Sequence, residues 1–159
     1  FAALLMYNKM KLLILFLFSV LLCETFAQQP QKKVKENPLM ATEFTMNKQK
    51  VKSGGDGLVL AKFIPASGIH LNAEMLPEFE VDSLAPVLFT GDAEIPKIKK
   101  KGKEHPDERK PVTQKFMVKK NAKKGTYTIK AKCTYFFCSE KEGWCNRFTA
   151  PFEFVLVIE

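Results

Sequence analysis

The chain has 159 residues, of which 46% are hydrophobic and 11% aromatic, and it carries a formal net charge of +8 at pH 7. This length is sufficient for one domain with a substantial hydrophobic core. Much of the charge lies in residues 97–124, which hold twelve Lys or Arg, three Asp or Glu and a single aromatic residue, Phe116. Because nucleic-acid surfaces combine basic with aromatic side chains, this composition argues against a nucleic-acid partner.

Residues 10–27 begin with Met-Lys, continue with a short apolar run and end in small residues, which is the pattern of a secretory signal peptide. We therefore assign residues 1–27 to an export signal, with residues 1–9 upstream of the true start, and expect the mature chain to begin at Gln28. The apolar run is too short for a mature anchor, so we expect no membrane span after cleavage. A lipoprotein anchored through Cys23 is the alternative. Either product reaches a compartment in which disulfides persist.

Residues 28–49 are expected to form a polar lead-in and a first strand, and residues 50–159 one β-domain. Short apolar runs alternate there with Gly, Pro, Asn and Asp, which is typical of a sandwich or barrel. The expected strands are 58–64, 69–72, 79–84, 86–89, 115–119, 126–137 and 151–158. Three prolines and a lysine run in residues 96–111 indicate a loop or a weak edge strand. We interpret the basic segment 97–124 as a solvated loop, with an acidic partner or anionic lipid headgroups as functional alternatives.

The clearest strand, residues 126–137, alternates apolar and polar side chains, which places every second residue in the core. The inward set is Tyr127, Ile129, Ala131, Cys133, Tyr135 and Phe137. The same rule buries Phe152, Phe154, Leu156 and Ile158 in the last strand. With no helix of more than a turn or two expected, the pattern predicts an all-β antiparallel sandwich of roughly seven to nine strands.

Three cysteines follow the export signal, and they divide into a single residue and a pair. The alternation buries Cys133, where a thiol behaves as a small apolar side chain. Cys138 and Cys145 flank a polar stretch, residues 139–144, that contains Gly143 and suits a hairpin turn. A hairpin brings its two flanking positions to disulfide distance.

The residues alone leave the chemistry of this pair open, since it can be a structural disulfide, a redox-active pair or a metal clip. The metal clip lacks ligands, because His70 and His105 show no ligand spacing with the cysteines. Aromatic residues crowd the pair and would shield a redox-active disulfide until a partner thiolate arrives. The chain has no Gly-rich phosphate loop and no Gly-x-Ser-x-Gly motif, so we expect neither a hydrolase nor a transferase, and no cofactor.

Residues 131–138 (AKCTYFFC), a short polar loop and then Gly143-Trp144-Cys145 resemble the N-terminal periplasmic domain of the thiol:disulfide interchange protein DsbD. Residues 68–72 (GIHLN) are similar to that family's early strand beside the cysteines. The resemblance implies an immunoglobulin-like sandwich, a periplasmic location and a thioredoxin-like partner that is itself exported or membrane-tethered. It also implies that Cys145 forms the mixed disulfide with the partner and that Cys138 resolves it.

Two hypotheses follow for the function of the chain. In the first, it is an exported, monomeric interchange domain that passes electrons through the catalytic pair Cys138 and Cys145. The expected neighbours of the pair are His70, Tyr135, Phe137 and Trp144. His70 would then stabilise a thiolate or exchange protons. In the second, the chain is a non-catalytic immunoglobulin-like binding module with a structural disulfide and a basic interaction loop.

Overall fold

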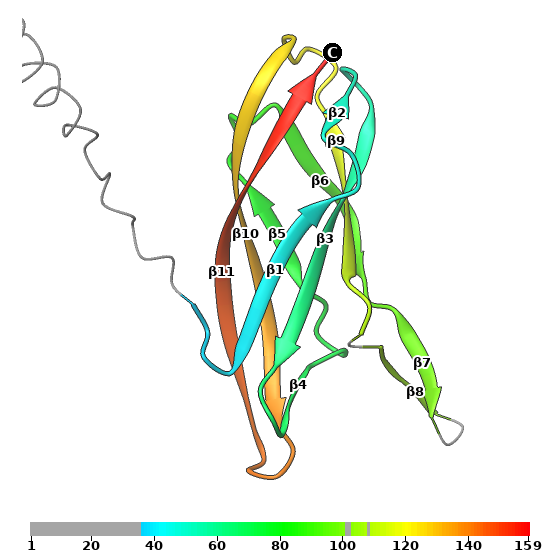
Figure 1. Cartoon of the computed structure of the whole chain (residues 1–159), viewed down its shortest axis with the longest axis vertical. Coiled ribbons are helices and arrows are strands. Elements are labelled where there is room, and N and C mark those ends of the chain that lie inside the picture. Colours follow the sequence, from blue (N-terminus) through cyan, green and yellow to red (C-terminus); the bar gives the residue numbers. More distant parts are fainter. Residues whose placement is uncertain (1–35, 101–102, 108) are drawn as a thin grey trace, which may run out of the picture. The chain divides into compact units, whose positions relative to one another are not determined.

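The computed structural model describes residues 36–100, 103–107 and 109–159 (Figure 1). The predicted export signal, residues 1–27, and the alternative lipidation site at Cys23 lie outside these ranges. Within them, no helix is long and apolar enough to cross a membrane. The strands are β1 (Met40–Met46), β2 (Lys50–Val51), β3 (Asp56–Pro65), β4 (Ile69–Leu71), β5 (Glu78–Val81), β6 (Val87–Glu94), β7 (Lys97–Lys100), β8 (Lys103–Pro106), β9 (Val112–Val118), β10 (Gly125–Ser139) and β11 (Trp144–Ile158).

The strands form two sheets that pack face to face, and β7 and β8 form a separate hairpin. One sheet has the order β1-β3-β9-β6, and the other has the order β2-β11-β10-β4, with β5 also paired to β10. Every pairing is antiparallel except the short contact between β2 and β11. If β1, β3, β4, β6, β9, β10 and β11 are lettered A to G in chain order, the two sheets have the orders A-B-E-D and G-F-C. This is the arrangement of an immunoglobulin domain of constant type. The predicted all-β, immunoglobulin-like sandwich is therefore confirmed.

The core lies between the sheets and is rich in aromatic contacts. Phe63 of β3 meets Tyr135 of β10 edge-on, with ring centroids 4.9 Å apart, and Phe44 of β1 stacks on Phe152 of β11 at 4.1 Å. The inward set predicted for β10 is confirmed, since Ile129, Ala131, Cys133, Tyr135 and Phe137 are buried and Tyr127 is partly buried. Burial of each large apolar side chain contributes about 1.5–3 kcal/mol, so these contacts dominate the stability of the sandwich.

The hydroxyl group of Tyr135 connects the start of the described chain to this core. It donates a hydrogen bond to the Met40 carbonyl at 3.1 Å and accepts one from Nδ2 of Asn37 at 3.2 Å. All three residues are buried, so the Asn37 amide, the Tyr135 hydroxyl and the Met40 carbonyl satisfy one another's hydrogen bonds in place of water. Burial also raises the pKa of Tyr135 to about 12, because the phenolate would lose its hydration.

The last strand is longer than predicted, because it begins at Trp144 instead of residue 151. Pro151 suggested a boundary, but it lies inside β11, opposite Lys132 of β10. Among the described residues, β11 has a neighbour on its other side only where β2 pairs with Val157 and Ile158. Pro151 therefore occupies an edge position, where a sheet tolerates the missing N–H group.

The basic segment, residues 97–124, does not form one solvated loop as predicted. It contains the β7–β8 hairpin, which projects from the sandwich in Figure 1, then the whole of β9 and the turn that leads into β10. Pro96 precedes the hairpin and Pro106 ends it, so neither proline interrupts its ladder. The lysines of the segment are thus distributed over several elements.

Candidate functional site

The cysteine pair lies at the tip of the β10–β11 hairpin, where the register places Cys138 directly opposite Cys145. Residues 140–143 form the turn between the strands. In this turn Gly143 adopts a left-handed φ of 70° and donates its N–H to the Ser139 carbonyl at 2.9 Å. Glycine takes up this conformation without the steric penalty that a Cβ atom introduces. A left-handed glycine therefore closes the turn that holds the two cysteines in register.

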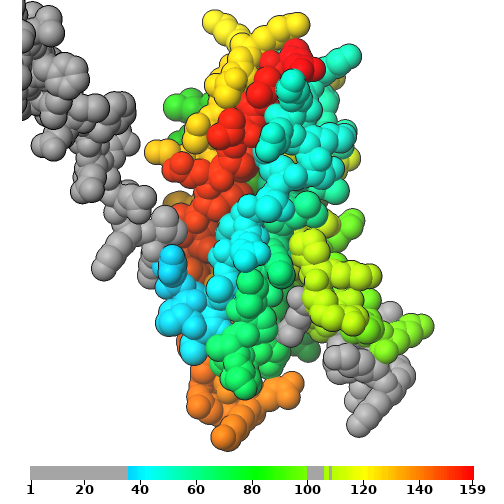
Figure 2. Space-filling view, in the orientation of Figure 1, coloured from blue at the N-terminus to red at the C-terminus, as the bar shows by residue number. Residues whose placement is uncertain are grey.

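A disulfide joins Cys138 and Cys145, with an S–S distance of 2.04 Å. Tyr135 and Phe137 of β10 point into the core, so alternation along the strand directs Cys138 to the outer face of the sheet. The hairpin tip, drawn in orange, projects beyond the neighbouring strands in the space-filling view (Figure 2). The disulfide thus lies outside the packed core, at an end of the sandwich that a partner protein can approach.

The two cysteines of the disulfide differ in exposure, since Cys138 is only 7% exposed whereas Cys145 is an exposed residue. β10 has β11 on one side and β4 on the other, so Cys138 lies inside the sheet, opposite His70. Among the described residues, β11 has a second neighbour only at the end distant from the tip, where β2 pairs with Val157 and Ile158. Cys145 therefore lies on an open edge. A thiolate from another protein has easier access to its sulfur than to that of Cys138.

An open groove lies beside the disulfide, because the sheet edge next to β10 is interrupted. β4 pairs with residues 137–139 of β10, and β5 pairs with residues 131–134. The connection between them, residues 73–77, forms no strand and leaves the ladder. Both cysteines line the resulting groove together with His70, Asn72, Glu74 and Trp144.

The four predicted neighbours of the cysteine pair lie on two different faces of the sheet. His70 pairs with Cys138 and therefore shares the face of the disulfide. Trp144, the neighbour of Cys145 in β11, packs against the core on the other face and also lines the groove. Tyr135 and Phe137 lie on the core side, where the Phe137 ring meets the Trp144 ring edge-on at 5.9 Å and the Tyr135 ring at 6.1 Å. Trp144 also donates a hydrogen bond from Nε1 to the Glu142 carboxylate. The two core rings thus support the hairpin tip from the core side of the sheet.

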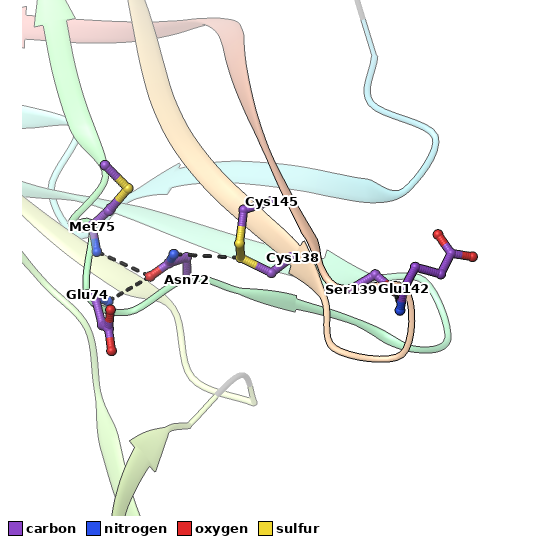
Figure 3. Close-up of a disulfide and its surroundings, with 7 residues drawn as sticks. All are labelled: Asn72, Glu74, Met75, Cys138, Ser139, Glu142 and Cys145. Carbon is purple, nitrogen blue, oxygen red and sulfur yellow. Dashed lines mark hydrogen bonds between the residues drawn. A yellow bond between two sulfur atoms is a disulfide. The ribbon is translucent and has the colours of Figure 1, made fainter.

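Asn72 is a residue of the site that the sequence reasoning did not select. Its Nδ2 donates a hydrogen bond to Sγ of Cys138 at 3.6 Å (Figure 3). Its Oδ1 accepts hydrogen bonds from the backbone N–H groups of Glu74, at 2.9 Å, and Met75, at 3.3 Å. An asparagine at the end of a strand, before a polar connection, is a common initiator of such an Asx turn. The resemblance of residues 68–72 to a strand beside the cysteines placed Asn72 near the pair, but it did not indicate the hydrogen bond to Cys138.

The third cysteine does not take part in this site. Cys133 is a free thiol with 0% exposure on the core side of β10, as predicted. Burial raises the pKa of this thiol, because the thiolate would be poorly solvated in the core. Within the described ranges, no three His, Cys, Asp or Glu side chains form a group that could hold a metal ion.

Fold and site together define an all-β, immunoglobulin-like sandwich with a disulfide across the hairpin of its last two strands. No protein-family model matches the chain, and no curated protein matches it. Among solved structures it is similar to the crystal structure of the N-terminal periplasmic domain of ScsB from Proteus mirabilis, at 14% identity and a TM-score of 0.43. The match covers 76% of the present chain and 47% of the ScsB chain, so the present chain spans about half the length of the ScsB chain. At this level of similarity, it carries no conclusion about function.

Proposed function

We propose that this chain is an exported thiol:disulfide interchange domain that acts as a monomer and exchanges electrons with a thioredoxin-like protein through Cys138 and Cys145. The observation that carries the proposal is the asymmetric disulfide, with Cys145 exposed on an open edge and Cys138 held inside the sheet. The resemblance of residues 131–145 to the DsbD N-terminal domain supports it. So does the predicted export signal, since exported compartments maintain disulfides.

The exchange begins when a thiolate of the partner attacks Sγ of Cys145 along the axis of the S–S bond. A new bond forms between the partner sulfur and Cys145, and Cys138 leaves with the electron pair as a thiolate. The second thiolate of the partner then attacks the partner sulfur of the mixed disulfide and releases Cys145. The partner ends as a disulfide and this chain as a dithiol, so two electrons have moved to the chain together with two protons. The reverse sequence passes the electrons on.

The fold suits this chemistry because the disulfide is separate from the packing that holds the sandwich together. The core residues beneath the tip, Tyr135 and Phe137, are held by contacts with aromatic side chains, so we expect them to remain in place when the S–S bond is broken. The groove formed by residues 70–74 and the hairpin turn leaves space for the segment of a partner that carries the attacking thiolate. In this proposal His70, which pairs with Cys138 in the β4–β10 ladder, exchanges a proton with the released sulfur.

The test compares two single-cysteine forms of the pair, Cys138→Ser and Cys145→Ser, each also carrying Cys133→Ala. The probe is a thioredoxin whose resolving cysteine is replaced by Ser and whose remaining thiol carries the yellow leaving group thionitrobenzoate. Attack on this probe forms a mixed disulfide and releases colour at a measurable rate.

We expect the Cys138→Ser form, which retains the exposed Cys145, to react at least about tenfold faster than the Cys145→Ser form, because thiol exchange depends on access. Rapid unfolding in urea should equalise the two rates and serves as the control for intrinsic thiol reactivity. Equal rates in the folded proteins, or no mixed disulfide with either one, would contradict the proposed exchange.

A further inference from the structure

Asn72 lies where the sheet edge is interrupted beside the disulfide. It follows β4 directly, and its backbone N–H extends the ladder by donating to the Phe136 carbonyl at 2.9 Å. The chain then departs from β10 through the turn that contains Glu74 and Met75. The backbone of Asn72 is therefore anchored to the strand that carries Cys138, and its side chain begins from a defined position.

The turn also determines which end of the amide faces the sulfur. The N–H groups of Glu74 and Met75 are donors, so the side-chain atom between them must be the oxygen, Oδ1. The amide NH₂ group is then directed at Sγ of Cys138, 3.6 Å away, as Figure 3 shows. This orientation follows from the hydrogen-bond network and requires no assumption about the redox state of the sulfur.

We propose that Asn72 is a catalytic residue of the exchange reaction, in which its amide N–H stabilises Cys138 as the leaving thiolate; this inference rests on the proposed function of the disulfide. A sulfur in a disulfide is a weak, neutral acceptor, whereas the departing sulfur accumulates negative charge. Hydrogen bonds to charged acceptors are about twice as strong as those between neutral groups, so the contact strengthens as the S–S bond breaks. Asn72 thus favours departure of Cys138 and, in reverse, maintains this sulfur as a nucleophile.

The other polar groups of the groove make a neutral donor useful at this position. The carboxylates of Glu74 and Glu140 line the same groove and oppose the formation of a nearby thiolate by like-charge repulsion. An amide donates at every pH, so the contribution of Asn72 to leaving-group stability does not depend on protonation of a side chain.

The matched variants separate the donor from the turn. Asn72→Asp retains an oxygen for the N–H groups of Glu74 and Met75 but replaces the donor with a carboxylate. Asn72→Ser is neutral and also retains an acceptor for the turn, so it controls for the added charge. Asn47→Asp is the distant control. Oδ1 of Asn47 also accepts a hydrogen bond from a backbone N–H group, that of Leu58, at 2.7 Å. Asn47 is exposed and follows the last residue of β1, whereas the contact of β1 with Tyr135 is at its first residue, Met40.

Two measurements are made on each variant. The first is the rate at which dithiothreitol reduces the disulfide of the full chain. The second is the pH profile of iodoacetamide alkylation of Cys138 in a Cys145→Ala background. We expect Asn72→Ser to slow reduction about tenfold and to raise the apparent pKa of Cys138 by about one unit, with a larger change for Asn72→Asp, because one hydrogen bond to a charged sulfur is lost. Asn47→Asp should change neither.

The inference is overturned if Asn72→Ser and Asn72→Asp both leave the reduction rate and the alkylation profile within twofold of the wild-type values. It is also overturned if Asn47→Asp changes them as much as the Asn72 variants do. Dithiothreitol needs no docking surface, so the outcome is independent of the thioredoxin experiment. An Asn72 effect without thioredoxin exchange would contradict the proposed function and retain the role of Asn72 at the sulfur.

Discussion

Removal of the Cys138–Cys145 disulfide is predicted to lower the free energy of unfolding by about 2.5 kcal/mol and to leave the domain folded. The two cysteines are separated by seven positions in sequence, so the bond closes a small loop. In the chain-entropy description, a closed loop of about eight residues restricts the unfolded chain by about 2.5 kcal/mol at 25 °C. This is a moderate fraction of the roughly 5–15 kcal/mol by which domains are stable.

The folded structure gives no reason for a larger loss. The disulfide lies next to the turn, and the β10–β11 ladder continues from there to Gly125 and Ile158 at the opposite end. Large side chains with complete burial, such as Phe116 and Leu156, lie in the core between the sheets and not at the hairpin tip. Reduction should therefore loosen the last pairs of the hairpin and leave the sandwich intact.

The assay is urea unfolding of the wild type and of a Cys138→Ala/Cys145→Ala double variant. Far-ultraviolet circular dichroism follows the sandwich, and the fluorescence of Trp144, the one tryptophan of the chain, follows the hairpin tip. We expect a lower midpoint with an unchanged slope, since the surface exposed on unfolding is nearly the same. A loss above about 5 kcal/mol, beyond the usual range for a disulfide, or a double variant without β-sheet signal in buffer, would refute this reasoning. The disulfide would then be a staple, and the reduced chain could not carry electrons.

Three further outcomes are expected. Tyr135→Phe should lower the free energy of unfolding in urea by about 1–3 kcal/mol, because it leaves two buried polar partners without a hydrogen bond; an unchanged midpoint would contradict that network. Cys133 should resist aromatic disulfide reagents at pH 8 in the folded chain and react only in denaturant, because it is buried and its thiol pKa is raised. The hydrogen bond from Arg109 holds the pKa of Asp107 below its usual range. The ionised Asp107 carboxylate therefore stabilises the fold above pH about 4, and this stabilisation is lost as the pH falls through the lowered pKa of Asp107. Asp107→Asn should remove that part of the acid dependence of stability, and an acid unfolding curve of unchanged shape would count against it.

The sequence was most informative where one periodicity extends over many residues. The alternation from Tyr127 to Phe137 predicts the core face of β10, because residues two apart in a strand must share a face. The polar stretch with Gly143 predicts the turn, since a left-handed position favours glycine. These are local rules, and the structure follows them.

The features that distinguish the two cysteines are not local and could not be predicted in this way. Cys138 and Cys145 share a face by alternation, yet they differ in exposure because β4 flanks β10 whereas the edge of β11 is open at the tip. The contact between Asn72 and Cys138 likewise depends on the pairing of β4 with β10, since the two residues are 66 positions apart in the sequence. Both are properties of strand order, which depends on contacts between distant parts of the chain.

The reduction potential of the Cys138–Cys145 disulfide tests the central claim most directly. The chain from Gln28, the expected mature start, carries Cys133→Ala to remove the third thiol. It is equilibrated with defined ratios of oxidised and reduced dithiothreitol, and the reduced fraction is counted by alkylation. The account predicts a potential clearly above about −300 mV, in the range of disulfides that exchange with thioredoxin-like proteins. A potential below about −300 mV belongs to structural disulfides. That result would contradict the account and leave a binding module with a structural staple.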